Sequence, residues 1–247
     1  MKHMIKVILF DLGNTLIYSI NPWDRVLYSA MQDFYKELIC SDPSISKKIT
    51  AKELYGCLYQ YYDQRKIDLI EINSFNILKT CLQAKEITTM PEMVIRRALN
   101  TLYSVTQLNW SIEIDALPIL AELKHRGYSL GLLSNAADDH DVQQLIDQWK
   151  LRPYFNFILT SADCGYRKPH PLMFQKASSY FNIDPSNMMM IGDTLSADIL
   201  GANQMDIFSV WITRRSQNPN IDLTIKPDAT IVNLGDILNL LDKFEEG

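Results

Sequence analysis

The chain shows two kinds of hydrophobic pattern, and one gives way to the other near residue 17 and again near residue 109. Short, unbroken apolar runs lie at the start and in the second half, and their length is typical of strands buried on both faces of a sheet. These runs are Ile5–Phe10, Leu130–Leu133, Phe155–Leu159, Met188–Ile191 and Phe208–Ile212. Helical periodicity near 140–150, 171–181 and 196–204 separates the later runs. Strands that alternate with helices predict an α/β fold with a doubly wound parallel sheet.

The segment between the first two runs has helical periodicity throughout. Asn21 and Pro22 predict the capped start of a helix of about 20 residues. Its apolar positions recur every three or four residues, at Leu27, Met31, Phe34 and Leu38. Thr50 with Glu53 predicts a capping box at the start of a second helix, and two further helices are expected near 77–82 and from Pro91 onward. We therefore expect an α/β domain of residues 1–17 and 109–247, interrupted by a helical domain of residues 18–108.

Composition narrows the class of protein without naming a function. A chain of 247 residues with 47% hydrophobic and 21% charged residues is typical of an ordinary globular protein. The net charge of −5 is not gathered into basic runs, which argues against a nucleic-acid partner. The apolar runs are too short to cross a bilayer and the start does not resemble a signal peptide, so we expect a cytoplasmic protein without a membrane partner. The four cysteines show no metal-binding spacing, and we expect reduced thiols.

Chemically active residues follow the predicted strands directly. Asp11 follows the first run, Ser134 and Asn135 follow the second, Lys168 follows the third after a short loop, and Asp193 follows the fourth. Asp198 comes about one helical turn after Asp193. Because ligands of a doubly wound sheet bind at the carboxyl ends of its strands, we expect these side chains to converge.

The residue types at this edge suit a phosphoryl group and a divalent cation. Two carboxylates a few ångström apart raise each other's pKa unless a cation lies between them. Mg²⁺ prefers oxygen ligands and binds through one or two carboxylates, so Asp11 and Asp193 are candidate ligands. A carboxylate such as Asp11 can also act as a nucleophile. Ser134 and Asn135 can donate hydrogen bonds to phosphoryl oxygens, and Lys168 can balance the charge that develops.

Four segments resemble motifs of the haloacid dehalogenase superfamily of hydrolases, in the same order along the chain. They are Phe10-Asp11-Leu12-Gly13-Asn14-Thr15-Leu16, Leu132-Leu133-Ser134-Asn135, Gly165-Tyr166-Arg167-Lys168-Pro169-His170-Pro171 and Gly192-Asp193-Thr194-Leu195-Ser196-Ala197-Asp198. The resemblance covers the expected α/β domain. It implies that the helical insertion is a cap of the family's first type, which closes over the site and selects substrates.

The resemblance also implies a role for each matching residue. Asp11 would form an aspartyl-phosphate, and Asp11, Asp193 and the Gly13 carbonyl would hold Mg²⁺. Ser134 would bind the phosphoryl group with Asn135 and Thr15 nearby, while Lys168 would balance charge and Asp198 would orient the ligands of the metal. The implied function is a Mg²⁺-dependent phosphatase of a small phosphorylated metabolite, with no oligomeric state indicated.

Gly13 departs from the usual family pattern, because most phosphatases of this family carry an aspartate two residues after the nucleophile. That aspartate protonates the leaving group, and losing a general acid costs about 10²–10⁴ in rate. This departure leaves a second interpretation open. The chain could be a catalytically weak or inactive relative that binds metal and a phosphorylated ligand or a protein partner. A 2-haloacid dehalogenase is a further alternative, although Asp193 argues against it. A phosphonatase would need a Schiff-base lysine, for which Lys47, Lys48 and Lys52 are the candidates.

Overall fold

The computed structural model describes residues 4–215 and 224–246, and the chain divides into two units. Residues 1–18 and 112–247 make the first, which we call the sheet unit, and residues 19–111 make the second, which we call the helical unit. The chain passes between the units along two strands, β2 (Ile17–Ser19) and β3 (Trp110–Ile112), which pair with each other as a separate two-stranded sheet. The two ends of the helical unit therefore lie side by side.

The sheet unit is built on six parallel strands in the order β5-β4-β1-β6-β7-β8. The strands are β1 (Val7–Phe10), β4 (Ser129–Ser134), β5 (Phe157–Thr160), β6 (Met188–Gly192), β7 (Phe208–Ile212) and β8 (Ala229–Ile231). The strand order reverses direction at β1, which has β4 on one side and β6 on the other. The predicted α/β class and the doubly wound parallel sheet are confirmed.

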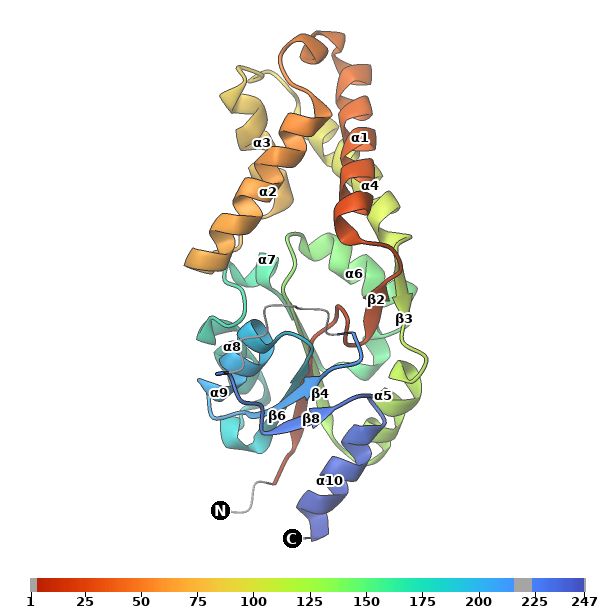
Figure 1. Ribbon diagram of the computed structural model, residues 1–247, viewed down its shortest axis with the longest axis vertical. Helices are drawn as coiled ribbons and strands as arrows, with labels where there is room; N and C mark the ends of the chain where they lie inside the picture. The colour runs from red at the N-terminus through yellow and green to blue at the C-terminus, as the bar shows by residue number, and fades with distance from the viewer. Residues whose placement is uncertain (1–3, 216–223, 247) are drawn as a thin grey trace. The chain divides into compact units, whose positions relative to one another are not determined.

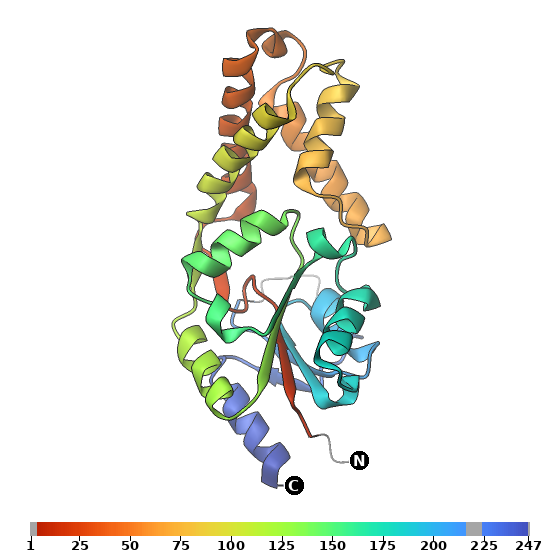
Figure 2. The same cartoon turned by 180° about the vertical axis from the view of Figure 1, so that it is seen from behind.

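Helices cover both faces of this sheet (Figures 1 and 2). They are α5 (Ala116–His125), α6 (Asp139–Gln148), α7 (Ser161–Cys164), α8 (Pro171–Phe181), α9 (Leu200–Asn203) and α10 (Asp236–Glu246). Single turns lie at Arg152–Tyr154 and Pro185–Asn187, and a wide turn lies at Leu195–Ile199. Because both faces are covered, Ile8, Leu9 and Phe10 of β1 are fully buried, which explains their unbroken apolar run.

The helical unit contains α1 (Trp23–Ser41), a short turn at Pro43–Lys47, α2 (Ala51–Asp68), α3 (Ser74–Ala84) and α4 (Glu92–Gln107). The expected stripe of α1 is buried from Leu27 to Leu38, and α1 packs against α4. Thr50 and Glu53 form the expected capping box of α2. The prediction that Asn21 caps α1 was wrong: Pro22 precedes the helix, and the Asn21 side chain instead donates a hydrogen bond to Asn109 at 3.0 Å.

No helix in the described ranges is both long enough and apolar enough to cross a membrane.

Candidate functional site

The register of the central strands places the candidate residues at one edge of the sheet. Phe10 of β1 lies opposite Leu132 of β4 and Ile191 of β6, so these three strands end close to the same level. Asp11 follows β1, Ser134 is the last residue of β4, and Asp193 follows β6. The strand order changes direction at β1, and that point of a doubly wound sheet is where ligands bind.

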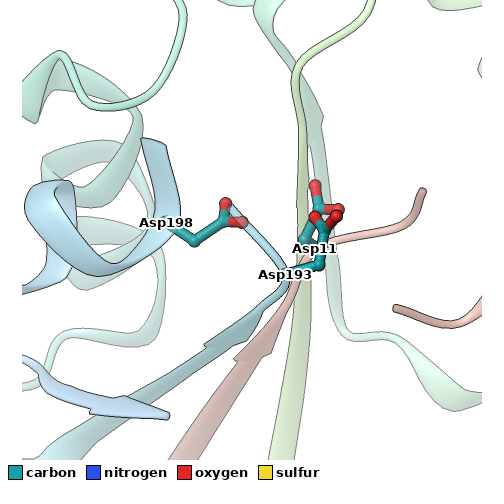
Figure 3. Close-up of side chains that lie close together, drawn as sticks. All are labelled: Asp11, Asp193 and Asp198. Atoms are coloured by element: carbon teal, nitrogen blue, oxygen red, sulfur yellow. The ribbon is translucent and has the colours of Figure 1, made fainter. Parts of the chain in front are cut away.

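Three carboxylates meet at this edge. Oxygen atoms of Asp11, Asp193 and Asp198 lie within 4.8 Å of one another, and Asp198 points from the wide turn at Leu195–Ile199 toward the other two (Figure 3). Burial, together with the neighbouring carboxylates, raises the pKa of Asp11 to about 7 although Lys168 opposes the rise. Burial and Asp198 likewise raise the pKa of Asp193 to about 6. A divalent cation among these oxygens would relieve the repulsion, and an all-oxygen donor set fits Mg²⁺.

Lys168 is the counter-charge of the cluster and is itself buried, with only 2% of its surface exposed. Its Nζ atom lies 2.7 Å from an oxygen of Asp11 and 2.7 Å from an oxygen of Asp198, and it also donates a hydrogen bond to the Leu133 carbonyl. Burial lowers the pKa of Lys168, but the two carboxylates outweigh burial and the net shift is upward. The ammonium group therefore stays charged at neutral pH and fixes the position of the Asp11 carboxylate.

Asn135 uses its side chain to hold the backbone of Lys168. Its Oδ1 atom accepts a hydrogen bond from the Lys168 amide at 2.8 Å, and its Nδ2 atom donates one to the Lys168 carbonyl at 3.0 Å. The sequence placed Asn135 beside the phosphoryl group, whereas the structure commits both polar ends of its amide to Lys168. The peptide bond that follows, from Lys168 to Pro169, is cis.

Two hydroxyl groups at the site have no protein partner among the described residues. Thr15 is fully buried and its Oγ1 atom makes no hydrogen bond. The hydroxyl of Ser134, a residue that is 6% exposed, also makes none to the described residues. A buried hydroxyl without a partner carries an unfavourable desolvation cost of about 1–3 kcal/mol. Both groups are therefore suited to bind an oxygen-rich ligand.

Gly13 and Asn14 form the tight turn that follows Asp11. The amides of Leu16 and Ile17 both donate to the Leu12 carbonyl, which closes the turn. Asn14 has a positive φ of 55°, and its side chain forms a hydrogen bond to Asp193 that lowers the pKa of that carboxyl. Gly13 itself does not have a positive φ; among the described glycines only Gly127 and Gly165 do. Its backbone conformation is thus open to residues with a side chain.

Comparison with known protein families shows which family the chain belongs to. Residues 5–206 match the haloacid dehalogenase-like hydrolases. The chain belongs to this family. It is similar to a glyceraldehyde 3-phosphate phosphatase of Pyrococcus furiosus, with 26% identity over 97% of this chain and 94% of the relative. It is also similar to a phosphoserine phosphatase of Thermus thermophilus, with 30% identity over 50% of this chain and 48% of the relative.

The fold of this hydrolase has close counterparts among solved structures. One is a 2-haloacid dehalogenase from Pseudomonas syringae pv. Tomato DC3000, with a TM-score of 0.72 and 23% sequence identity. The match covers 98% of this chain and 100% of the other. At this level of identity the likeness shows the fold alone.

Several residues of the hydrolase that shape the site were missed at the level of sequence. Gly192 leaves room for Asp198, since a Cβ atom there would lie 2.3 Å from Asp198 Oδ2. The Thr194 amide donates to Asp198 Oδ2 at 3.0 Å, and its hydroxyl donates to Asp193 Oδ1 at 3.0 Å. Trp211 Nε1 donates to the Asp193 carbonyl at 2.9 Å. The glycine directly before Asp193 was the one available signal, because glycine is favoured where another group approaches the backbone closely.

Other polar residues near the motifs are occupied elsewhere. His170 accepts the Leu172 amide at the start of α8 and stacks on Tyr166, and Asp138 accepts the Asp141 amide at the start of α6. The lysines considered for a Schiff base, at positions 47, 48 and 52, are all exposed. These lysines lack the buried, apolar setting that activates a Schiff-base lysine, so their surroundings do not favour phosphonatase chemistry.

Proposed function

We propose that this hydrolase is a Mg²⁺-dependent phosphatase that cleaves a small phosphorylated metabolite through an aspartyl-phosphate on Asp11. The observation that carries the proposal is the contact of Lys168 Nζ with both Asp11 and Asp198 at 2.7 Å. This contact holds one carboxylate in place, as a nucleophile requires, inside a cluster of three whose repulsion a divalent cation would relieve. The two relatives named as phosphatases support the same class of substrate.

The roles of the protein groups follow from their positions. An oxygen of Asp11 forms a bond to phosphorus while the bond from phosphorus to the leaving oxygen breaks, and the leaving oxygen keeps the electron pair. Water then attacks phosphorus, which releases inorganic phosphate and restores Asp11. Lys168 balances negative charge throughout, and Ser134 and Thr15 donate hydrogen bonds to phosphoryl oxygens.

Asp11, Asp193 and the Gly13 carbonyl would hold Mg²⁺, which would neutralise phosphoryl charge and draw the phosphate toward Asp11. Asp198 would act through Lys168 and Thr194 rather than on the substrate, because its two oxygens already contact these residues. Residues 18–108 would serve as the cap, and its closure would exclude water and select the organic part of the substrate.

A screen of phosphorylated metabolites with Mg²⁺ and with excess chelator tests the proposal. It includes p-nitrophenyl phosphate and 2-chloropropionate, with Asp11→Asn as the matched control that keeps size but removes the attacking charge. We expect phosphate release that needs Mg²⁺ and falls to background in Asp11→Asn. Phosphate release undiminished by chelator would show that the metal assignment is wrong. Chloride release from 2-chloropropionate would show that the chemistry is that of a dehalogenase.

Gly13 favours a second candidate, a relative that binds a phosphorylated ligand with little or no turnover. No side-chain acid stands two residues after Asp11, so the leaving oxygen lacks the usual proton donor. Calorimetric titration with Mg²⁺ and inorganic phosphate distinguishes the two candidates. Binding of both without phosphate release from any substrate in the screen would support the binding protein over the phosphatase.

A further inference from the structure

One side chain in the segment that follows β7 contacts both linkers, the name we give to β2 and β3 with the residues next to them, where they join the sheet unit. The guanidinium carbon of Arg215 lies 3.9 Å from the centre of the Tyr18 ring, and Tyr18 belongs to β2. The Nε atom of the same arginine lies 2.7 Å from Glu113 Oε1, and its Nη2 atom lies 3.4 Å from Glu113 Oε2. Glu113 directly follows β3. Arg215 thus joins Tyr18, the last residue of the sheet unit before the helical unit, to Glu113, the second residue after the chain returns.

Arg215 and the preceding Arg214 each pair with a carboxylate in the segment that follows β3. The Glu113 side chain is only 4% exposed, whereas Arg215 is 37% exposed, so the carboxylate is the deeper partner. The preceding residue, Arg214, places Nη1 at 2.9 Å from both oxygens of Asp115, and Asp115 accepts the Leu234 amide at 3.1 Å. Two consecutive arginines therefore hold the segment just after β3 against the end of β7.

The same region of the sheet touches the candidate site. Trp211, in β7 shortly before these arginines, donates a hydrogen bond from Nε1 to the Asp193 carbonyl. On the other side, the Glu113 amide donates to the Leu16 carbonyl at 2.9 Å, and Leu16 lies in the turn that follows Asp11. The linkers are therefore tied, where they join the sheet unit, to both of the strand ends that carry Asp11 and Asp193.

We propose that Arg215 is a positioning residue. It restrains both linkers where they join the sheet unit, so that movement of the helical unit does not displace these residues. The inference rests on the proposed function where it concerns substrate binding. A planar guanidinium can stack on a ring and pair with a carboxylate at the same time, whereas an ammonium group cannot reproduce both contacts. Because β2 and β3 have three residues each, their own pairing supplies few hydrogen bonds to resist movement.

Hydrogen exchange of the full chain tests this proposal without relying on turnover. The variants are Arg215→Met, Arg215→Lys and, as matched control, Arg126→Met. Arg126 lies in the same unit, is 27% exposed and pairs with two carboxylates, those of Glu122 and Asp242. We expect the linker amides, among them those of Ile20 and Glu113, to exchange about tenfold faster in Arg215→Met, equivalent to about 1.4 kcal/mol of lost local stability. The central strands and Arg126→Met should keep wild-type protection.

The lysine variant separates positioning from general stability. Arg215→Lys retains a positive charge beside buried Glu113, so we expect near-wild-type thermal stability together with the faster linker exchange. With p-nitrophenyl phosphate we expect a several-fold higher KM and a kcat within about twofold, because a looser linker adds ordering cost to closure.

Wild-type linker exchange in Arg215→Met would overturn the proposal, as would an equal increase across the whole sheet unit. Faster linker exchange with an unchanged KM would overturn the part that concerns substrate binding. If the wild type hydrolyses nothing, the proposed function fails, but the exchange data still decide whether Arg215 holds the linkers.

Discussion

Gly192 offers a sharp test of the site, because a single added methyl group would collide with a charged side chain. A Cβ atom at position 192 would lie 2.3 Å from Asp198 Oδ2, whereas ordinary contacts begin at 3.4 Å. In Gly192→Ala the Asp198 carboxylate would have to withdraw by about 1.1 Å, the difference between these two distances. That shift exceeds the tolerance of its hydrogen bond from the Thr194 amide at 3.0 Å and of its contact with Lys168 at 2.7 Å.

The size of the effect follows from the bonds that would break. One hydrogen bond to a charged group contributes about 1.5–3 kcal/mol. If that energy is lost from the transition state, kcat/KM falls by about 10- to 150-fold at 1.36 kcal/mol per decade. We expect a similar loss of folding stability, because Lys168 remains buried with one fewer partner.

The assay is p-nitrophenyl phosphate hydrolysis together with thermal unfolding of the purified variant. Gly235→Ala is the matched control, since a Cβ there would meet only Ile119 at an ordinary 3.9 Å. A double-mutant cycle with Asp198→Ala isolates the cause: once Asp198 is absent, Gly192→Ala should add little. Equal rates for Gly192→Ala and Gly235→Ala would refute the reasoning.

Three further predictions concern the proton donor, the Lys168 loop and pH. Gly13→Asp should speed hydrolysis of alkyl phosphates by up to about 100-fold and of aryl phosphates less, because it restores an acid where φ permits a side chain; a flat leaving-group dependence in the wild type would contradict the premise. Asn135→Ala should lower kcat and melting temperature with little change in KM, whereas a raised KM alone would indicate that Asn135 contacts phosphate. In chelator, melting temperature should fall as pH rises from 5 to 8, because the raised pKa values of Asp11 and Asp193, about 7 and about 6, make the folded state bind more protons than the unfolded state over that range. Mg²⁺ should restore stability at pH 8, and a melting temperature that stays level from pH 5 to 8 without metal would refute the electrostatic argument.

Sequence patterns revealed the elements whose physical signal is long or unbroken. The apolar run that contains β1 marked a strand buried on both faces, and the charged or hydroxylic residue after each run marked the functional edge of the sheet. The pairing strands β2 and β3, and the edge strand β8, were missed because three residues are too few to show a period. The turn at Leu195–Ile199 was expected as ordinary helix; periodicity does not reveal the bond between the Thr194 amide and Asp198 that shapes it.

The sequence predicted which residues converge at the site better than it predicted the contacts that each of them makes. Spacing brought Asp11, Lys168 and Asp193 together, because strand ends of a parallel sheet meet whatever lies between them in sequence. The same spacing could not show that Asn135 hydrogen-bonds the backbone of Lys168, because that depends on the path of the loop that carries Lys168. Trp211 was invisible for a related reason: its indole reaches sideways from β7 to the neighbouring strand.

The position of the helical insertion has a consequence for the order in which the chain is made and folded. Val7 in β1 pairs with Ser129 and with Met188, so the strand that carries Asp11 emerges from the ribosome long before either neighbour exists. The helices of residues 23–107 carry their own apolar core and make local contacts, and such contacts form fast. We therefore expect the insertion to fold before β4 and β6 have been synthesised. Until then the apolar β1 segment remains unpaired and exposed. The nascent chain is most vulnerable to aggregation during that interval, and an early-folding insertion shortens the effective loop that β1 must close.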